Sequence, residues 1–155
     1  MEPLSILAGL TIGMHMATVH IPHRDYQNDI NPGMYVQHTE TGLTVGAYHN
    51  TLRRTSVYVT KSFNTGKLFG MQTNVMLGGI TGYKRIESYN LQDDSTGHPV
   101  WVTFEEGVSK HSVAPMLAAS IELPSMQGVT PRITLVPPSS NAGSTALHFS
   151  MEHKF

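Results

Sequence analysis

The sequence predicts an all-β protein, an antiparallel meander of about eight strands closed into a barrel. Apolar and polar residues alternate with the two-residue period of a strand in segment after segment. Short clusters rich in Gly, Pro, Asn and Ser separate these segments at the close spacing typical of hairpins. No run is long enough to predict a helix with similar support. Eight strands suffice to close a barrel, and closure removes the exposed sheet edges.

The expected strands follow in order along the chain, each with alternating character. Turn signals such as "HTETG", "FNTGK", "PSMQG" and "PPSSNAG" stand between them. The segments are 4–20 ("LSILAGLTIGMHMATVH"), 33–37 ("GMYVQ"), 43–49 ("LTVGAYH"), 55–63 ("TSVYVTKSF"), 68–83 ("LFGMQTNVMLGGITGY"), 113–123 ("VAPMLAASIEL"), 128–137 ("GVTPRITLVP") and 145–155 ("TALHFSMEHKF").

Residues 86–111 interrupt this pattern and contain the only Trp. We expect them to form an excursion from one rim, with a short hairpin around "PVWVTFE". At 155 residues the chain suits one domain, so residues 1–155 are predicted to form a single barrel that includes this insertion.

The alternation leaves open which face of the sheet points inward. In the last segment Leu147, Phe149 and Met151 share one face, and His148 and Ser150 lie on the other. A membrane barrel places the apolar set against lipid, whereas a water-soluble barrel places it in the core.

Composition narrows the functional classes. Charged residues make up 14% of the chain, against about 25% in an ordinary domain, which predicts a surface that is small or is hidden in lipid, a partner or an assembly. A homo-oligomer is one such assembly. The net charge of −1 gives no general attraction to nucleic acid, so no nucleic-acid partner is expected. Without Cys, disulfides, thiolate metal sites and Cys nucleophiles are excluded.

The first residues of the chain indicate where in the cell the protein is expected. "MEPLSILAGL" has Glu2 where a signal peptide needs a positive charge, and no small-residue cleavage site follows. Taken literally, this start predicts a cytoplasmic protein. If the N-terminus is instead an engineered mature form, the outer membrane is the expected location.

The stretch "VGAYHNTLRRTSVYVTKSF" joins two predicted strands and gathers several polar side chains at the joint. Paired arginines with imidazole and amide donors suit a phosphate or carboxylate. The alternative is an ordinary turn flanked by solvated charges. The residues at this rim are His49, Asn50, Thr51, Arg53 and Arg54, with His23 and Arg24 added if the first long loop folds over the same end.

"AYHNTLRRTSVYVTKSF", followed by "GGITGY" and "LVPPSSNAGSTALHFSMEHKF", resembles the outer-membrane lipid A palmitoyltransferase family and its bacterial and phage relatives. The upstream "HIPHRDYQNDINPGMYV" fits the segment before the second strand of that family. The resemblance implies an eight-stranded barrel whose lumen holds an acyl chain and whose rim holds a catalytic His and an Asp-Ser pair. By position the His is His20 or, as second choice, His23, and the pair falls on Asn50 and Thr51. Asn50 cannot act as a carboxylate, which is a departure from the family pattern.

Three further residues complete the predicted ligand-binding set. Tyr83 ends a long strand beside two cations, and Arg132 and His148 are expected to project into the lumen from neighbouring strands. The spacing His20-x-x-His23, even with His15, does not place metal ligands on one face of a strand, so no metal site and no cofactor are predicted.

Three functions follow from these observations. The first is a barrel that binds a small or acyl-bearing anionic ligand and modifies it, with His20 as base and Thr51 near the reacting centre. The second is a soluble, phage-borne barrel that sequesters or cleaves a small anionic, nucleotide-like molecule. The third is a structural or assembly subunit with buried interfaces.

Overall fold

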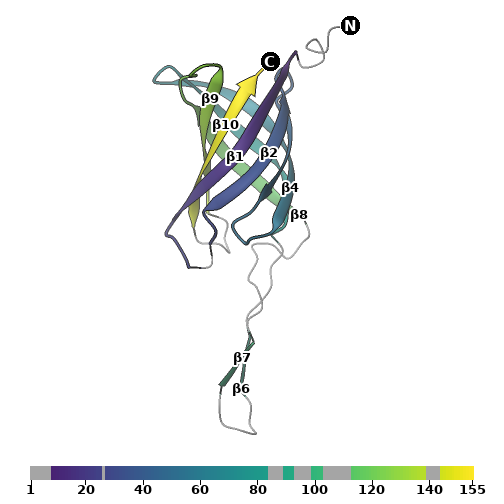
Figure 1. Ribbon diagram of the computed structural model, residues 1–155, viewed down its shortest axis with the longest axis vertical. Helices are drawn as coiled ribbons and strands as arrows, with labels where there is room; N and C mark the ends of the chain where they lie inside the picture. Colours follow the sequence, from purple (N-terminus) through teal and green to yellow (C-terminus); the bar gives the residue numbers. More distant parts are fainter. Residues whose placement is uncertain (1–7, 26, 84–88, 93–98, 103–112, 139–143) are drawn as a thin grey trace.

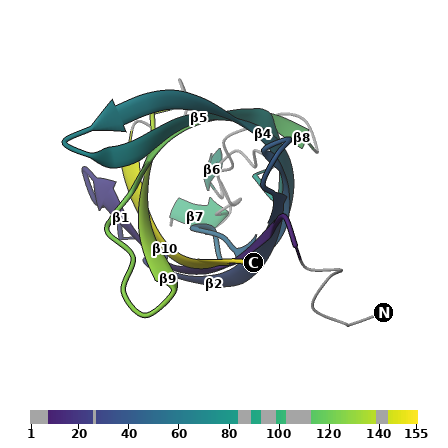
Figure 2. The same ribbon diagram turned by 90° about the horizontal axis from the view of Figure 1, so that it is seen from above.

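The computed structural model describes residues 8–25, 27–83, 89–92, 99–102, 113–138 and 144–155. Eight antiparallel strands form a closed barrel in the order β1-β10-β9-β8-β5-β4-β3-β2, which confirms the predicted fold class. Figure 2 shows the closed ring of strands. Their bounds are β1 (Leu10–Ile21), β2 (Ile30–His38), β3 (Leu43–His49), β4 (Thr55–Leu68), β5 (Met71–Thr81), β8 (Val113–Glu122), β9 (Val129–Val136) and β10 (Thr145–Lys154).

Between β5 and β8 the chain forms a separate two-stranded sheet. Its strands, β6 (Tyr89–Gln92) and β7 (Pro99–Val102), pair antiparallel. This agrees with a hairpin around "PVWVTFE", although the rest of the predicted excursion 86–111 lies outside the described residues. The described part of the chain holds no helix long and apolar enough to cross a membrane.

The barrel has two distinct ends, visible in Figure 1. At the lower rim β1, β3, β5 and β9 end and β2, β4, β8 and β10 begin, and this rim includes the turn at residues 50–54. The upper rim is formed by the shorter turns β2–β3, β4–β5 and β8–β9, and the start of β1 and the end of β10 lie there.

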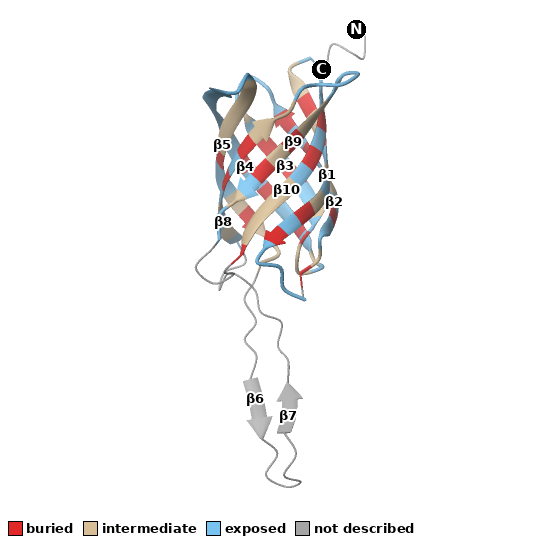
Figure 3. Cartoon of the chain, turned by 90° about the vertical axis from the view of Figure 1, so that its left-hand side faces the viewer, coloured by how far each residue is buried: buried red, intermediate tan, exposed pale blue. Residues whose placement is uncertain are grey.

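The polar face of the sheet points into the lumen, and the apolar face points outward. In β3, Thr44 is 4% exposed, whereas its neighbour Val45 is 49% exposed. In β10, Glu152 is buried and Met151 is exposed. Figure 3 shows the resulting pattern of alternating buried and exposed positions around the barrel. The question that periodicity left open is therefore answered: Phe149, on the apolar face, points away from the lumen.

Two tyrosine rings pack over glycines inside the barrel. Tyr35 is paired across strands with Gly13, and Tyr58 is paired with Gly46. A Cβ atom on either glycine would overlap the facing ring. Glycine thus makes room for the rings that form the small buried cluster with Ile80.

We expect Gly46→Ala to destabilise the barrel by about 1–3 kcal/mol, because the added methyl group must displace the Tyr58 ring. The free energy of unfolding in urea measures this. Gly79→Ala is the control: its Cβ would meet the Val113 side chain at 3.2 Å and the Ala114 carbonyl oxygen at 3.9 Å, so a change within about 0.5 kcal/mol is expected. Equal effects of the two substitutions would contradict the ring-over-glycine packing.

Candidate functional site

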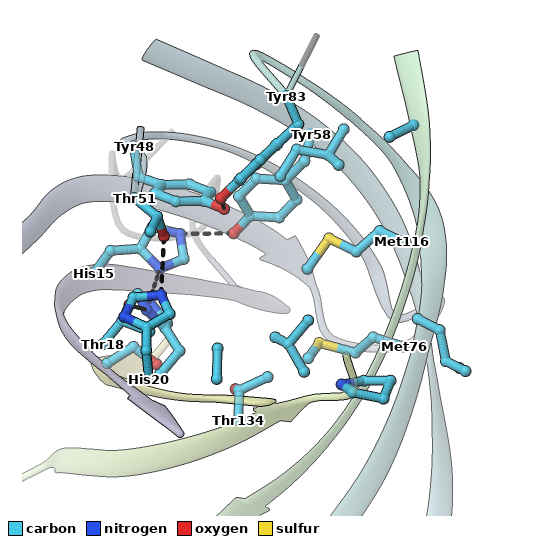
Figure 4. Close-up of a pocket in the computed structure, with 18 of the residues that line it drawn as sticks. His15, Thr18, His20, Tyr48, Thr51, Tyr58, Met76, Tyr83, Met116 and Thr134 are labelled. Carbon is cyan, nitrogen blue, oxygen red and sulfur yellow. Dashed lines mark hydrogen bonds between the residues drawn. The ribbon is translucent and has the colours of Figure 1, made fainter. Parts of the chain in front are cut away.

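A cavity of about 480 Å³ occupies the lumen and reaches the lower rim. Its two sides differ in chemistry. One side is apolar and includes Met76, Ile80 and Met116, and the other presents imidazole and hydroxyl groups, among them His15 and His20. Figure 4 shows Met76 and Met116 on the side opposite these histidines. The cavity can therefore hold a ligand with an apolar chain and a polar, reactive end.

At the mouth of this cavity, His20 lies between a carboxylate and a hydroxyl. Its Nδ1 is 3.1 Å from Asp29 Oδ1, and its Nε2 is 3.1 Å from Thr51 Oγ1. His20 is buried, and both His20 and Thr51 line the cavity. The order acid, imidazole, hydroxyl is that of a nucleophile activated by a general base.

The three residues come from three different parts of the lower rim, and backbone hydrogen bonds hold these parts together. His20 lies near the end of β1. The Thr18 amide donates to the Asp29 carbonyl at 2.8 Å, which fixes Asp29 beside that strand. The Asn28 amide donates to the Thr51 carbonyl at 2.9 Å, which joins the first connection to the 50–54 turn. The geometry of the site is thus set by the main chain.

The partners of His20 determine its tautomer. An ionised carboxylate only accepts hydrogen bonds, so Nδ1 of His20 carries the proton that is donated to Asp29. Nε2 then has a free lone pair and accepts the hydrogen bond of the Thr51 hydroxyl. In this arrangement His20 is ready to take a proton from Thr51 or from a bound hydroxyl group.

Sequence analysis did not identify Asp29. Its other carboxylate oxygen, Oδ2, is 3.2 Å from Nε2 of His23, so one carboxylate joins both histidines of the predicted pair. His23 is half-exposed, unlike His20. Of the two histidines, His20 is the one that contacts Thr51.

Two tyrosines complete the mouth of the cavity. The hydroxyls of Tyr48 and Tyr83 are 2.8 Å apart, and both residues line the cavity together with Thr51. Burial raises the pKa of Tyr83, and hydrogen bonds with Tyr48 and Thr51 act in the opposite direction. Tyr83 is thus a protonated phenol at neutral pH, able to donate a hydrogen bond near Thr51.

Asn50, which the sequence predicts to be a catalytic residue, lies outside the lining of the cavity. Its side chain is fully buried and does not line the cavity. Its Oδ1 accepts from the amides of Leu52 and Arg54, and its Nδ2 donates to Ser56 Oγ and to the Gly82 carbonyl. The amide thus holds the 50–54 turn against the residue that precedes Tyr83, and it positions Thr51.

The predicted cationic residues surround the lower rim outside the cavity lining. His49 is exposed at the end of β3 on the outer face, and Arg53 is exposed in the turn with a positive φ of 59°. Arg24 is exposed in the first connection, where its amide donates to Gln27 Oε1 at 2.8 Å. The backbone amide of Arg54 bonds to Asn50. Arg24, His49 and Arg53 are thus exposed around the mouth and do not line the cavity, whereas His23 contacts Asp29 beside His20.

His148 is part of a hydrogen-bonded chain deeper in the lumen. Its Nδ1 is 2.8 Å from Thr18 Oγ1, and its Nε2 is 2.7 Å from Nδ1 of His15. Nε2 of His15 in turn lies 2.8 Å from the Tyr58 hydroxyl. Among the described residues, neither imidazole of this hydrogen-bonded chain contacts a carboxylate, which distinguishes it from the His20 centre.

Arg132 lies at the inner end of the cavity in a cluster of charges. Its Nη2 is 2.9 Å from Glu122 and 3.0 Å from Glu152. Lys154 Nζ is 2.6 Å from Glu122, and the Tyr35 hydroxyl donates to Glu152 at 2.8 Å. Arg132 also lines a second, polar cavity of about 310 Å³ toward the upper rim. The cluster therefore lies where the two cavities adjoin.

Within the described residues, no group of three or more His, Cys, Asp or Glu side chains is arranged to hold a metal ion. Models of known protein families and curated protein sequences give no match to this chain. The resemblance to the lipid A palmitoyltransferase family thus stays a prediction.

We expect Asn50→Asp to destabilise the protein by about 1–3 kcal/mol or more, because a buried carboxylate would face the Gly82 carbonyl in place of a donor. Unfolding in urea checks this. Asn64→Asp is the matched control, since exposed Asn64 uses only its Oδ1, as acceptor for Gly66, and should change stability little. An Asn50→Asp variant as stable as the wild type would contradict the positioning role.

Proposed function

We propose that this protein is a membrane-embedded β-barrel that binds an acyl-bearing anionic ligand and transfers or hydrolyses its acyl group at the lower rim. The observation that carries the proposal is the position of His20, between Asp29 and Thr51 at the mouth of a cavity with an apolar side. A base of this kind contributes typically 10²–10⁴-fold to acyl transfer.

The shape and lining of the cavity support an acyl-bearing ligand. A volume of about 480 Å³ is within the range of roughly 300–1,000 Å³ found for small-molecule sites. An acyl chain would lie along Met76, Ile80 and Met116 with its ester at the rim. Methionine adapts its shape to a flexible chain better than branched residues do.

Two exposed arginines at the mouth support an anionic headgroup. Arg24 and Arg53 lie on the two connections that supply Asp29 and Thr51, and the imidazole of His23 lies on the first of these connections. A phosphate or carboxylate held there would leave the acyl chain directed into the lumen and the ester near His20.

The outer surface supports the outer-membrane location over the cytoplasmic one. Every strand of the barrel has large apolar side chains that point outward and stay exposed, among them Met14, Met34, Val45, Val59 and Leu117. An exposed surface of this extent is unusual for a monomer in water. Most of the buried side chains inside the barrel are polar or charged instead, as in a barrel that contacts lipid.

We expect Val45→Arg to destabilise the barrel by about 2–4 kcal/mol when it is folded in phospholipid vesicles, because Val45 would face the acyl region. The free energy of unfolding from vesicles measures this. On a surface facing water, the same change at a half-exposed position would cost within about 0.5 kcal/mol. A chain that is folded and monomeric without detergent or lipid would contradict the membrane proposal and favour a soluble binder of small anions.

We expect His20→Ala to lower kcat for a long-chain p-nitrophenyl ester by roughly 10²–10⁴-fold in detergent micelles, because the base is lost. Asp29→Asn should also lower kcat, since the His20 tautomer would no longer be fixed. His153→Ala is the matched control, because this exposed histidine lies at the upper rim, where Nδ1 contacts only the Gly128 carbonyl in the described structure. Equal turnover by His20→Ala and the wild type would exclude His20 from the chemistry.

A further inference from the structure

We propose that Thr51 is the nucleophile of this reaction and that the acyl group passes through an ester on Thr51 Oγ1. This inference rests on the proposed function and deepens it, since transfer could otherwise occur directly from donor to acceptor. Thr51 Oγ1 is the oxygen within hydrogen-bond distance of His20 Nε2, at 3.1 Å, and the residue lines the cavity that would hold the ester.

A second threonine–histidine pair in the same lumen shows why Thr51 is favoured as the nucleophile. Thr18 also contacts an imidazole, since its Oγ1 is 2.8 Å from Nδ1 of His148. The other nitrogen of His148, however, faces His15 rather than a carboxylate. An imidazole that takes a proton gains a positive charge, and a carboxylate stabilises that charge, whereas a second imidazole does not. His20 has such a carboxylate in Asp29.

The tyrosine pair supplies a donor for the charge that develops on the substrate. Tyr48 and Tyr83 share a hydrogen bond of 2.8 Å between their hydroxyls and line the cavity beside Thr51. Figure 4 shows both rings on the same side of the cavity as Thr51. A phenol of this pair can donate to an oxyanion formed there.

The position of Thr51 is fixed by groups that do not react. The Asn28 amide donates to its carbonyl, and Asn50, the residue before it, accepts hydrogen bonds from the amides of Leu52 and Arg54, which follow it. A nucleophile held by the main chain needs little reorganisation before attack. This support explains how a threonine, with its additional methyl group, can keep one productive orientation of Oγ1.

The reaction balances in two steps. In the first, Thr51 Oγ1 gives its proton to His20 Nε2 and attacks the ester carbonyl carbon, and the oxyanion collapses with release of the donor alcohol, which takes the proton from His20. In the second, an acceptor hydroxyl or water gives its proton to His20 and attacks the threonine ester, and Thr51 leaves with that proton. Both steps use the hydrogen bonds that His20 already forms.

The test uses the full chain in detergent micelles with two probes, p-nitrophenyl palmitate and a long-chain alkyl fluorophosphonate. The expected result is a burst of about one p-nitrophenolate per chain and one phosphonyl group per chain by intact mass. Peptide mapping should place the phosphonyl group on Thr51 and not on Thr18. Thr51→Ala should lose the label and at least about 10²-fold in turnover, and Thr51→Ser should retain both.

Thr73→Ala, at the upper rim where its hydroxyl bonds to Thr65 and the Gly66 carbonyl, controls for the loss of a threonine and should label like the wild type. Circular dichroism and the labelled Thr51→Ser variant establish that the substituted chains are folded. If Thr51→Ala keeps turnover while His20→Ala loses it, the inference is overturned and the proposed function stands. A label on another residue also overturns it. If the wild type turns over neither probe, both the inference and the proposed function fail.

Discussion

Pairing between the first and last strands of the barrel is the constraint on which the rest of the structure depends. β1 and β10 pair from Thr11–Lys154 to Ile21–Thr145, so the barrel has no free edge. In a closed sheet every side chain faces either the lumen or the outside, and the apolar set lies outside. The polar set then has to fill the lumen, where each buried donor or acceptor needs a partner. The hydrogen-bonded chain of His15 and His148 and the cluster around Arg132 follow from this requirement.

The same closure assembles the site at the lower rim. Antiparallel pairing brings the ends of β1 and β3 and the start of β2 to one rim. His20, Asp29 and Thr51 therefore meet although they are far apart in the sequence. The backbone bonds from Thr18 to Asp29 and from Asn28 to Thr51 make this meeting specific. A register shift of one residue would turn His20 outward, since alternate residues of β1 face opposite sides. Strand register is therefore a condition for the acid–imidazole–hydroxyl arrangement.

Much of the fold could be predicted from the sequence because alternation and turn composition are local signals. The eight strands and the barrel follow from them, and the hairpin of β6 and β7 agrees with an expected break in the pattern. The direction of the two faces could not be predicted, because a period of two is the same whether Val45 contacts lipid or a core. Only the closed structure, with Glu152 buried and Met151 exposed, decides between them.

The candidate site could be predicted in part. His20 and Thr51 were identified, and the structure places them in contact. Asp29 was missed because nothing local marks it: it follows an irregular connection, and its role depends on the contact with β1. Asn50 was placed among the catalytic residues through a positional resemblance, but burial and four hydrogen bonds give it a role in the turn. A sequence motif specifies residue types, whereas side-chain direction comes from the fold.

The position of Arg132 has a consequence for the order of events at the site. Held by Glu122 and Glu152, it borders both the lower cavity and the upper one. If the lumen holds an acyl chain as proposed, this cluster would oppose passage of the chain to the upper rim, so donor and product would have to use the same mouth. Long-chain products would then compete with substrate for the empty barrel, and at high concentration they would slow turnover by occupancy alone.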